Sequence, residues 1–109
     1  MGNVIAERRN APRYPLVLAA EVVELPRGVK LSARTSDLSR TGCYIDTLNP
    51  VPQGSQVRVR ITHRQDIFEA VASAVYVSAG LGMGVCFTQI TAQQQATLDK
   101  WLNESGEEY

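Results

Sequence analysis

Residues 29–37, VKLSARTSD, alternate between apolar or small side chains and polar ones. The two alternating sets are Val29, Leu31, Ala33 and Thr35 on one side and Lys30, Ser32, Arg34 and Ser36 on the other. A period of two residues indicates a β-strand, because successive side chains of an extended chain point to opposite faces. Since one face is largely apolar and the other polar, the stretch predicts a half-buried strand of an antiparallel sheet.

The flanking sequence repeats this pattern between turn signals. Residues 56–62, QVRVRIT, alternate again, with valine and isoleucine inward and Arg58 and Arg60 outward. Further strand-like runs lie at residues 15–25, 42–46, 67–77 and 82–87, separated by segments such as PRG at 26–28 and NPVPQGS at 49–55. Six short strands with turns between them are typical of a small β-barrel or β-sandwich.

One helix is predicted near the C-terminal end. The segment TAQQ, from Thr91 to Gln94, fits a capping box in which the two side chains satisfy each other's backbone donors. Leu98, Trp101 and Leu102 then follow at i, i+3 and i+4, so they form one apolar stripe that can lie across the β domain. We interpret Trp101 as a core residue or barrel plug.

The charge balance limits the possible partners. Eleven Lys and Arg residues balance eleven Asp and Glu residues, which argues against a broad nucleic-acid-binding surface. Most of the basic residues fall within the first 40 positions, and a local positive site suits a small anionic ligand better than a polymer. An aromatic content of 6% is also low for a single-stranded nucleic-acid binder. We therefore expect no DNA or RNA partner.

The cysteine and histidine content argues against a metal site and against catalysis. Cys43 and Cys86 are far apart, no CxxC motif is present, and His63 is the only histidine, so no zinc pattern exists. His63 has no nearby nucleophile or orienting carboxylate pattern, so we expect no enzymatic activity. No signal peptide and no membrane-spanning apolar segment is visible, so we expect a soluble cytoplasmic protein without membrane insertion.

Three arginines lie close together ahead of the first strand, in ERRNAPRYP at residues 7–15: Arg8, Arg9 and Arg13. Residues 1–14 are polar and lack apolar periodicity, so we predict a flexible N-terminal arm that carries this arginine motif. Residues 15–103 then form the β domain with its helix, and residues 104–109 form an acidic tail. The arginines are either solvated surface charges or a clamp for an anion.

The segment DLSRTG, from Asp37 to Gly42, joins two predicted strands and holds a second group of candidate residues. Asp37 and Ser39 are two residues apart, so on an extended backbone they project to the same side. Gly42 permits a positive φ or the close approach of a ligand. The alternative is an ordinary turn in which Asp37 and Ser39 bond their own backbone.

Together, the arm and this segment resemble the two motifs of the PilZ domain family, whose members are bacterial receptors for the second messenger cyclic di-GMP. The family motif R-x-x-x-R matches Arg9 to Arg13, and [D/N]-x-S-x-x-G matches residues 37–42. The segments AVYV and GMGVCF, followed by a capped helix, also look like the closing part of the family, so the resemblance covers roughly residues 8–102. We predict a mostly β fold, a six-stranded antiparallel β-barrel with one C-terminal α-helix.

The resemblance implies a role for each matched residue. Arg9 and Arg13 would grip phosphate and guanine, because the planar guanidinium fork matches both. Asp37 and Ser39 would read a base, and Gly42 would leave room for the purine.

Three further residues have two interpretations each. Arg8 either stacks on a guanine, which in this family goes with binding an intercalated ligand dimer, or is a solvated charge. Tyr76 matches a position where the family often has an aromatic residue beside the ligand, but a core tyrosine is the alternative. Gly84, which has no side chain, leaves space either inside the barrel or near the base.

The expected function is that of a cyclic di-GMP receptor or adaptor without a cofactor. Ligand binding would order the N-terminal arm, and the ordered arm would signal through an unidentified protein partner. The alternative is a PilZ-like protein-interaction domain that acts constitutively without nucleotide.

Overall fold

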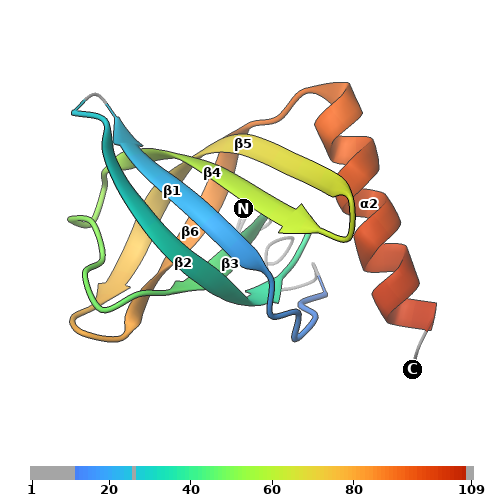
Figure 1. Ribbon diagram of the computed structural model, residues 1–109, viewed down its shortest axis with the longest axis horizontal. Coiled ribbons are helices and arrows are strands. Elements are labelled where there is room, and N and C mark those ends of the chain that lie inside the picture. Colours follow the sequence, from blue (N-terminus) through green and yellow to red (C-terminus); the bar gives the residue numbers. More distant parts are fainter. Residues whose placement is uncertain (1–11, 26, 108–109) are drawn as a thin grey trace, which may run out of the picture.

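The computed structural model describes residues 12–25 and 27–107, which form a closed antiparallel β-barrel with one helix (Figure 1). Around the barrel the strands follow the order β1-β2-β3-β6-β5-β4. The elements are β1 Ala19–Leu25, β2 Val29–Leu38, β3 Gly42–Asp46, β4 Gln56–His63, β5 Asp66–Ser78, β6 Gly82–Gln89 and α2 Ala92–Glu107. The predicted six-stranded antiparallel barrel with one C-terminal helix is confirmed.

The pairing of β1 with both β2 and β4 closes the barrel. Every strand therefore has two neighbours, and no strand of the barrel is left as an open edge. The alternation of β4 follows the prediction, with buried Val57, Val59 and Ile61 and exposed Arg58 and Arg60. In β4 the apolar set thus fills the interior, and the polar set covers the outer surface.

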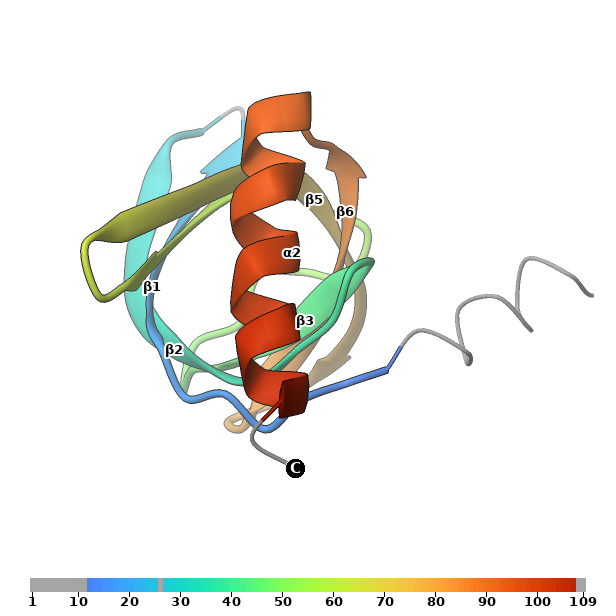
Figure 2. The ribbon, with the colours of Figure 1, turned by 90° about the vertical axis from the view of Figure 1, so that its right-hand side faces the viewer.

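Helix α2 crosses one end of the barrel, in front of the ring of strands in Figure 2. Its Leu98, Trp101 and Leu102 side chains are buried in the hydrophobic core, so the prediction of Trp101 as a plug is confirmed. The Trp101 ring packs edge-on against His63, with ring centroids 5.4 Å apart, and lies 6.3 Å from the ring of Phe68. Within residues 12–25 and 27–107, no helix is both long enough and apolar enough to cross a membrane.

The cap of α2 differs in one half from the predicted capping box. The backbone N–H of Gln94 donates to Oγ1 of Thr91 at 3.2 Å, as predicted. Oε1 of Gln94 instead accepts from the backbone N–H of Glu69 at 2.7 Å. Because α2 packs against β5, this tertiary bond replaces the local one and ties the start of the helix to that strand.

The first strand begins at Ala19 instead of residue 15. The preceding segment bonds to one buried side chain of β2, because Oγ1 of Thr35 donates to the carbonyl of Leu16 at 2.6 Å and accepts from the N–H of Leu18 at 3.0 Å. These bonds take the place of a regular strand ladder.

The predicted acidic tail is wrong at its start, because α2 continues to Glu107. Ser105 is buried, and Glu104 lies 3.2 Å from Nη1 of Arg64. Contacts with the barrel therefore extend the helix beyond the last apolar residue of its stripe.

Candidate ligand-binding site

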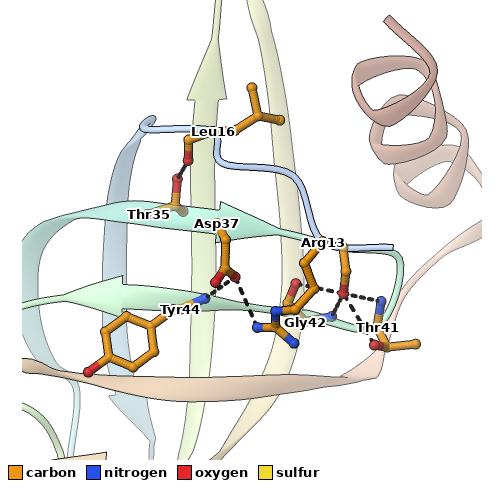
Figure 3. Close-up of polar contacts among 8 residues, drawn as sticks. Arg13, Leu16, Thr35, Asp37, Thr41, Gly42 and Tyr44 are labelled. Atoms are coloured by element: carbon orange, nitrogen blue, oxygen red, sulfur yellow. Dashed lines mark hydrogen bonds and ion pairs between the residues drawn. The ribbon is translucent and has the colours of Figure 1, made fainter. Parts of the chain in front are cut away.

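The N-terminal segment joins the barrel at Tyr14. The N–H of Tyr14 donates to the carbonyl of Leu38 at 2.9 Å, and the N–H of Leu38 donates back at 3.0 Å. One residue earlier, Nη2 of Arg13 lies 2.9 Å from Oδ1 of Asp37 (Figure 3). The prediction of a flexible arm over residues 1–14 is therefore wrong for its last two residues, because Arg13 and Tyr14 are bonded to β2. Arg8 and Arg9 lie outside the described residues.

The loop after β2 is a turn held by its own polar side chain, as the alternative interpretation of DLSRTG had it, but only Ser39 bonds to the backbone of the turn, since Asp37 bonds to Arg13 and Tyr44. Ser39 is completely buried, at 0% exposure. Its Oγ accepts from the backbone N–H groups of Thr41 and Gly42, both at 3.2 Å, and donates to the carbonyl of Gly42 at 3.2 Å. The expectation that Asp37 and Ser39 project to the same side is wrong, because the Ser39 hydroxyl turns inward to its own loop. Ser39 thus holds the turn in shape.

Gly42 lacks a side chain because β6 passes directly beside it. Gly42 pairs with Cys86, and a Cβ at residue 42 would overlap the carbonyl oxygen of Val85. The described glycines with positive φ are Gly28, Gly54 and Gly80. The close approach at Gly42 is therefore made by the backbone of β6, and the positive φ suggested from the sequence is wrong. The suggestion that Gly42 leaves room for a ligand stays a prediction.

We expect Gly42→Ala to lower the free energy of unfolding by about 1–3 kcal/mol, the usual cost of overpacking. The added methyl meets backbone, which cannot move aside without breaking the pairing of β3 with β6. Gly106→Ala is the control, because its Cβ would lie 3.4 Å from the Tyr14 hydroxyl, near an ordinary contact, and alanine favours a helix. Urea denaturation measures both variants. A Gly42→Ala variant as stable as wild type would contradict the close approach.

Two β-bulges turn residues of interest to the outside of the barrel. In β2 the register with β3 shifts just before Asp37, which then pairs with Tyr44. In β5 the register with β6 shifts just before Tyr76, which then pairs with Gly84. A bulge adds one residue to one strand, so the in–out alternation reverses beyond it. Both Asp37 and Tyr76 consequently face outward.

Four outward residues lie in one line across four neighbouring strands, and we call them the outer row: Asp37 on β2, Tyr44 on β3, Gly84 on β6 and Tyr76 on β5. Adjacent strands are about 4.8 Å apart, so the row spans roughly 14 Å. Arg13 is bonded to the row at its Asp37 end. Residues that are distant in the sequence thus form one continuous surface.

Tyr76 is not a core residue, because it is 49% exposed. A Cβ at Gly84 would overlap the ring of Tyr76, so Gly84 spares room on the outer face. Tyr44 was missed in the sequence interpretation, although its ring covers Gly82 in the same way and lies 6.0 Å from that of Tyr76. The alternation of GCYID, with Cys43 buried beside it, was the signal that pointed to an outward Tyr44.

A surface pocket of about 240 Å³ opens beside the outer row. Its lining includes Arg13, Thr41, Gly42, Tyr76, Gly84 and Cys86. A larger pocket of about 530 Å³ near Arg58 and Thr91 contains none of the predicted site residues. We therefore place the candidate site at the smaller pocket, where the two sequence motifs meet.

The carboxylate of Asp37 is held through one of its oxygens. Oδ1 accepts from Arg13 at 2.9 Å and from the backbone N–H of Tyr44 at 3.2 Å (Figure 3). Among the described residues, no donor is bonded to Oδ2. The Arg13 and Asp37 side chains are 47% and 32% exposed, so their pair is weak in water and can open for a competing anion.

Arg40 ties the turn to helix α2. Its Nε and Nη2 donate to the two carboxylate oxygens of Asp99 at 2.9 and 3.4 Å. The bond from Arg40 lowers the pKa of Asp99, although partial burial acts the other way. The stabilisation of the folded protein by ionised Asp99 is therefore fully present above the usual aspartate pKa of about 3.9. It is lost as the pH falls through the lowered pKa of Asp99 in the folded state. Since the Arg40 side chain is 61% exposed and the Asp99 side chain 38%, the contribution of the pair is small, but it joins the turn of the site to the helix.

The two cysteines are expected to react differently. Cys43 is fully buried, and this burial, followed by the nearby Asp37 carboxylate, raises the pKa of its thiol. Cys86 is only partly buried and lines the pocket. We expect iodoacetamide to alkylate Cys86 in the folded protein and Cys43 only after unfolding, as followed by peptide mass spectrometry. Equal alkylation rates in the folded protein would contradict the inward direction of Cys43.

The fold and the site together describe a small β-barrel domain with an arginine–aspartate pair and two tyrosines on its outer face. The family model of the PilZ domain matches residues 7–104. The chain belongs to the PilZ domain family, and the resemblance noted from its motifs is confirmed. No curated protein matches the chain.

Solved structures share this fold at low sequence identity. The PilZ domain of CeSA from a cellulose-synthesizing bacterium is 20% identical, with a TM-score of 0.71, and the match covers 91% of this chain and 100% of that one. The PilZ domain of YcgR from Escherichia coli, solved with c-di-GMP, is 16% identical, with a TM-score of 0.75 and 93% of both chains covered. PlzA from Borreliella burgdorferi, in complex with c-di-GMP, is 14% identical, with a TM-score of 0.63, and the match covers 90% of this chain but 44% of that one.

Proposed function

We propose that this protein is a receptor for cyclic di-GMP and that the outer row with Arg13 is its binding surface. The observation that carries the proposal is the contact between Arg13 and Asp37, which come from two motifs 24 residues apart and lie 2.9 Å from each other. The c-di-GMP complexes of YcgR and PlzA, which share the fold, support this ligand. No catalytic step is part of the proposal.

The chemistry of the two charged side chains fits the ligand. Cyclic di-GMP carries two phosphates and two guanines, and the Arg13 guanidinium can bind a phosphate or the guanine Hoogsteen edge with two parallel hydrogen bonds. Asp37 can accept guanine N–H donors at Oδ2. Because the N–H of Tyr44 holds Oδ1, the Asp37 carboxylate keeps its direction when Arg13 turns to the ligand.

The other motif residues act indirectly in this proposal. Ser39 fixes the turn through its bonds to residues 41 and 42, and Gly42 lets β3 and β6 approach closely. Both would keep Asp37 and the pocket in place, and Gly42, which lines the pocket, would leave room there for the ligand. The sequence motif thus combines one base-reading residue with two residues that shape its surroundings.

The arm would supply further cations and the output of the receptor. Arg8 and Arg9 would close over the ligand phosphates, and the arm, the ligand and the barrel would then form a composite surface for a protein partner. Amide hydrogen exchange at residues 4–11 should slow only when cyclic di-GMP is bound. Unchanged exchange at saturation would remove the arm from the mechanism.

One observation favours the alternative of a constitutive protein-interaction domain. Arg13 and Asp37 form an ion pair with each other, and the β-bridge between Tyr14 and Leu38 also holds the end of the arm against β2. Both contacts are made within the protein. The end of the arm is therefore in position without help from a nucleotide.

Calorimetric titration with cyclic di-GMP separates the two functions, with cyclic di-AMP, GTP and a short single-stranded oligonucleotide as controls. The receptor should bind cyclic di-GMP in the low-micromolar range or tighter and discriminate against the other three. The midpoint of thermal unfolding should rise, because the ligand binds only the folded state. No heat and no midpoint shift with cyclic di-GMP would exclude the receptor and leave the constitutive domain.

A further inference from the structure

Two glycines of β6 allow two tyrosines to lie against the outside of the barrel. A Cβ at Gly82 would lie 2.7 Å from Cε1 of Tyr44, and a Cβ at Gly84 would overlap the ring of Tyr76. Tyr44 therefore reaches over β6 from β3, and Tyr76 reaches over it from β5. The two ring centroids are 6.0 Å apart, and the ring planes are inclined by 38°. Together the rings form an aromatic floor above the glycines.

This floor lies next to the carboxylate proposed to select the base. Tyr44 is the direct cross-strand partner of Asp37, and residues opposed in this way have Cβ atoms about 5 Å apart. In Figure 3 the Tyr44 ring and the Arg13 guanidinium lie on opposite sides of the Asp37 carboxylate. A planar ring whose edge bonds to Asp37 can therefore cover Tyr44 while Arg13 binds an anion on the other side.

We propose that Tyr44 is a base-stacking residue, on which the guanine read by Asp37 lies face to face, with Tyr76 continuing the floor. This inference rests on the proposed cyclic di-GMP receptor and adds to it a residue outside both sequence motifs. Stacking on one aromatic ring strengthens the binding of a base by roughly 5- to 150-fold. Asp37 distinguishes guanine by its N–H donors, whereas Tyr44 adds affinity for any planar purine.

The same rings could serve only to cover the β6 backbone, since an aromatic side chain beside a strand glycine protects that backbone. Two substitutions separate this structural role from stacking. Tyr44→Leu and Tyr44→Phe both keep an apolar side chain above Gly82, but only phenylalanine keeps an aromatic face. A purely structural role predicts equal cyclic di-GMP affinity for the two variants.

We expect Tyr44→Leu to weaken cyclic di-GMP binding about tenfold and Tyr44→Phe to stay within about twofold of wild type, at similar midpoints of thermal unfolding. Ile67→Ala is the control, because it removes an exposed side chain from β5 at nine positions from Tyr76. Its affinity should equal that of wild type. The ring proton resonances of Tyr44 should also move upfield when wild-type protein is saturated with ligand.

Wild-type binding together with an unaffected Tyr44→Leu variant would overturn this inference and leave the receptor intact. Absence of binding to the wild-type protein would overturn both. If the Tyr44→Leu variant does not fold, the ring resonances of the wild-type protein distinguish stacking from a purely structural role. A Tyr44 ring that only covers Gly82 keeps its chemical shift when the protein is saturated with ligand.

Discussion

Arg13→Ala is expected to lower the affinity for cyclic di-GMP on the order of 100-fold, near the upper limit for one bidentate contact, and to leave the barrel folded. Arg13 precedes the first strand, and its side chain is bonded to Asp37 on the surface. The substitution removes a partner of the ligand and leaves the Asp37 carboxylate without its counter-charge, so it also repels the ligand phosphates. Isothermal titration calorimetry measures the loss.

Arg60→Ala is the matched control for this substitution. Nε of Arg60 lies 3.7 Å from the carboxylate of Glu69, and these side chains are 48% and 47% exposed, similar to Arg13. The variant removes one positive charge away from the outer row, so it should bind as wild type does. Equal losses in the two variants would indicate a general charge effect, and normal binding by Arg13→Ala would exclude the proposed site.

Trp101→Ala is expected to lower the free energy of unfolding by about 3–5 kcal/mol, the range for removing a large buried aromatic side chain. Trp101 is 1% exposed and fills the end of the barrel together with Leu98 and Leu102. A domain of this size has a total stability of about 5–15 kcal/mol, so the loss removes a large part of it. Urea denaturation followed by circular dichroism measures the change.

Lys100→Ala and Trp101→Phe test the reason for this loss. Lys100 precedes Trp101 in α2 and forms an exposed pair with Asp66 at 3.2 Å, so its removal should cost less than about 1 kcal/mol. Within the described residues, Nε1 of Trp101 has no hydrogen-bond partner, so phenylalanine loses volume but no bond. The loss of unfolding free energy in Trp101→Phe should therefore be larger than in Lys100→Ala and smaller than in Trp101→Ala. A Trp101→Ala variant as stable as wild type would contradict the plug.

The strands and the helix could be predicted because their signals are local. Alternation with a period of two residues marks β4, and the spacing of Leu98, Trp101 and Leu102 marks the buried face of α2. Both patterns arise because a side chain either faces the core or faces water. Local patterns do not indicate bonds between distant segments of the chain. An example is the Gln94 side chain, which bonds to Glu69 of β5 instead of completing the predicted capping box.

The candidate site could be predicted only in part. The motifs singled out Arg13 and Asp37, and the fold brings them into contact. Ser39 and Gly42 belong to the same motif, but one is buried in its turn and the other lies against the backbone of β6. A motif gives residue types and spacing, whereas burial depends on neighbouring strands. Tyr44 was overlooked because it lies outside both motifs, although the alternation of residues 42–46 indicated that it faces outward.

The family and the barrel follow from patterns within the chain, but the binding surface follows from pairing between its strands. Strict alternation from residue 29 would put Asp37 on the inner face with Thr35, and alternation from residue 68 would put Tyr76 inside with Ala74. One bulge in β2 and one in β5 reverse this and turn both side chains outward. A bulge exists only relative to the strand opposite, here β3 for Asp37 and β6 for Tyr76. The tertiary pairing of segments remote in sequence therefore sets which residues the ligand can reach.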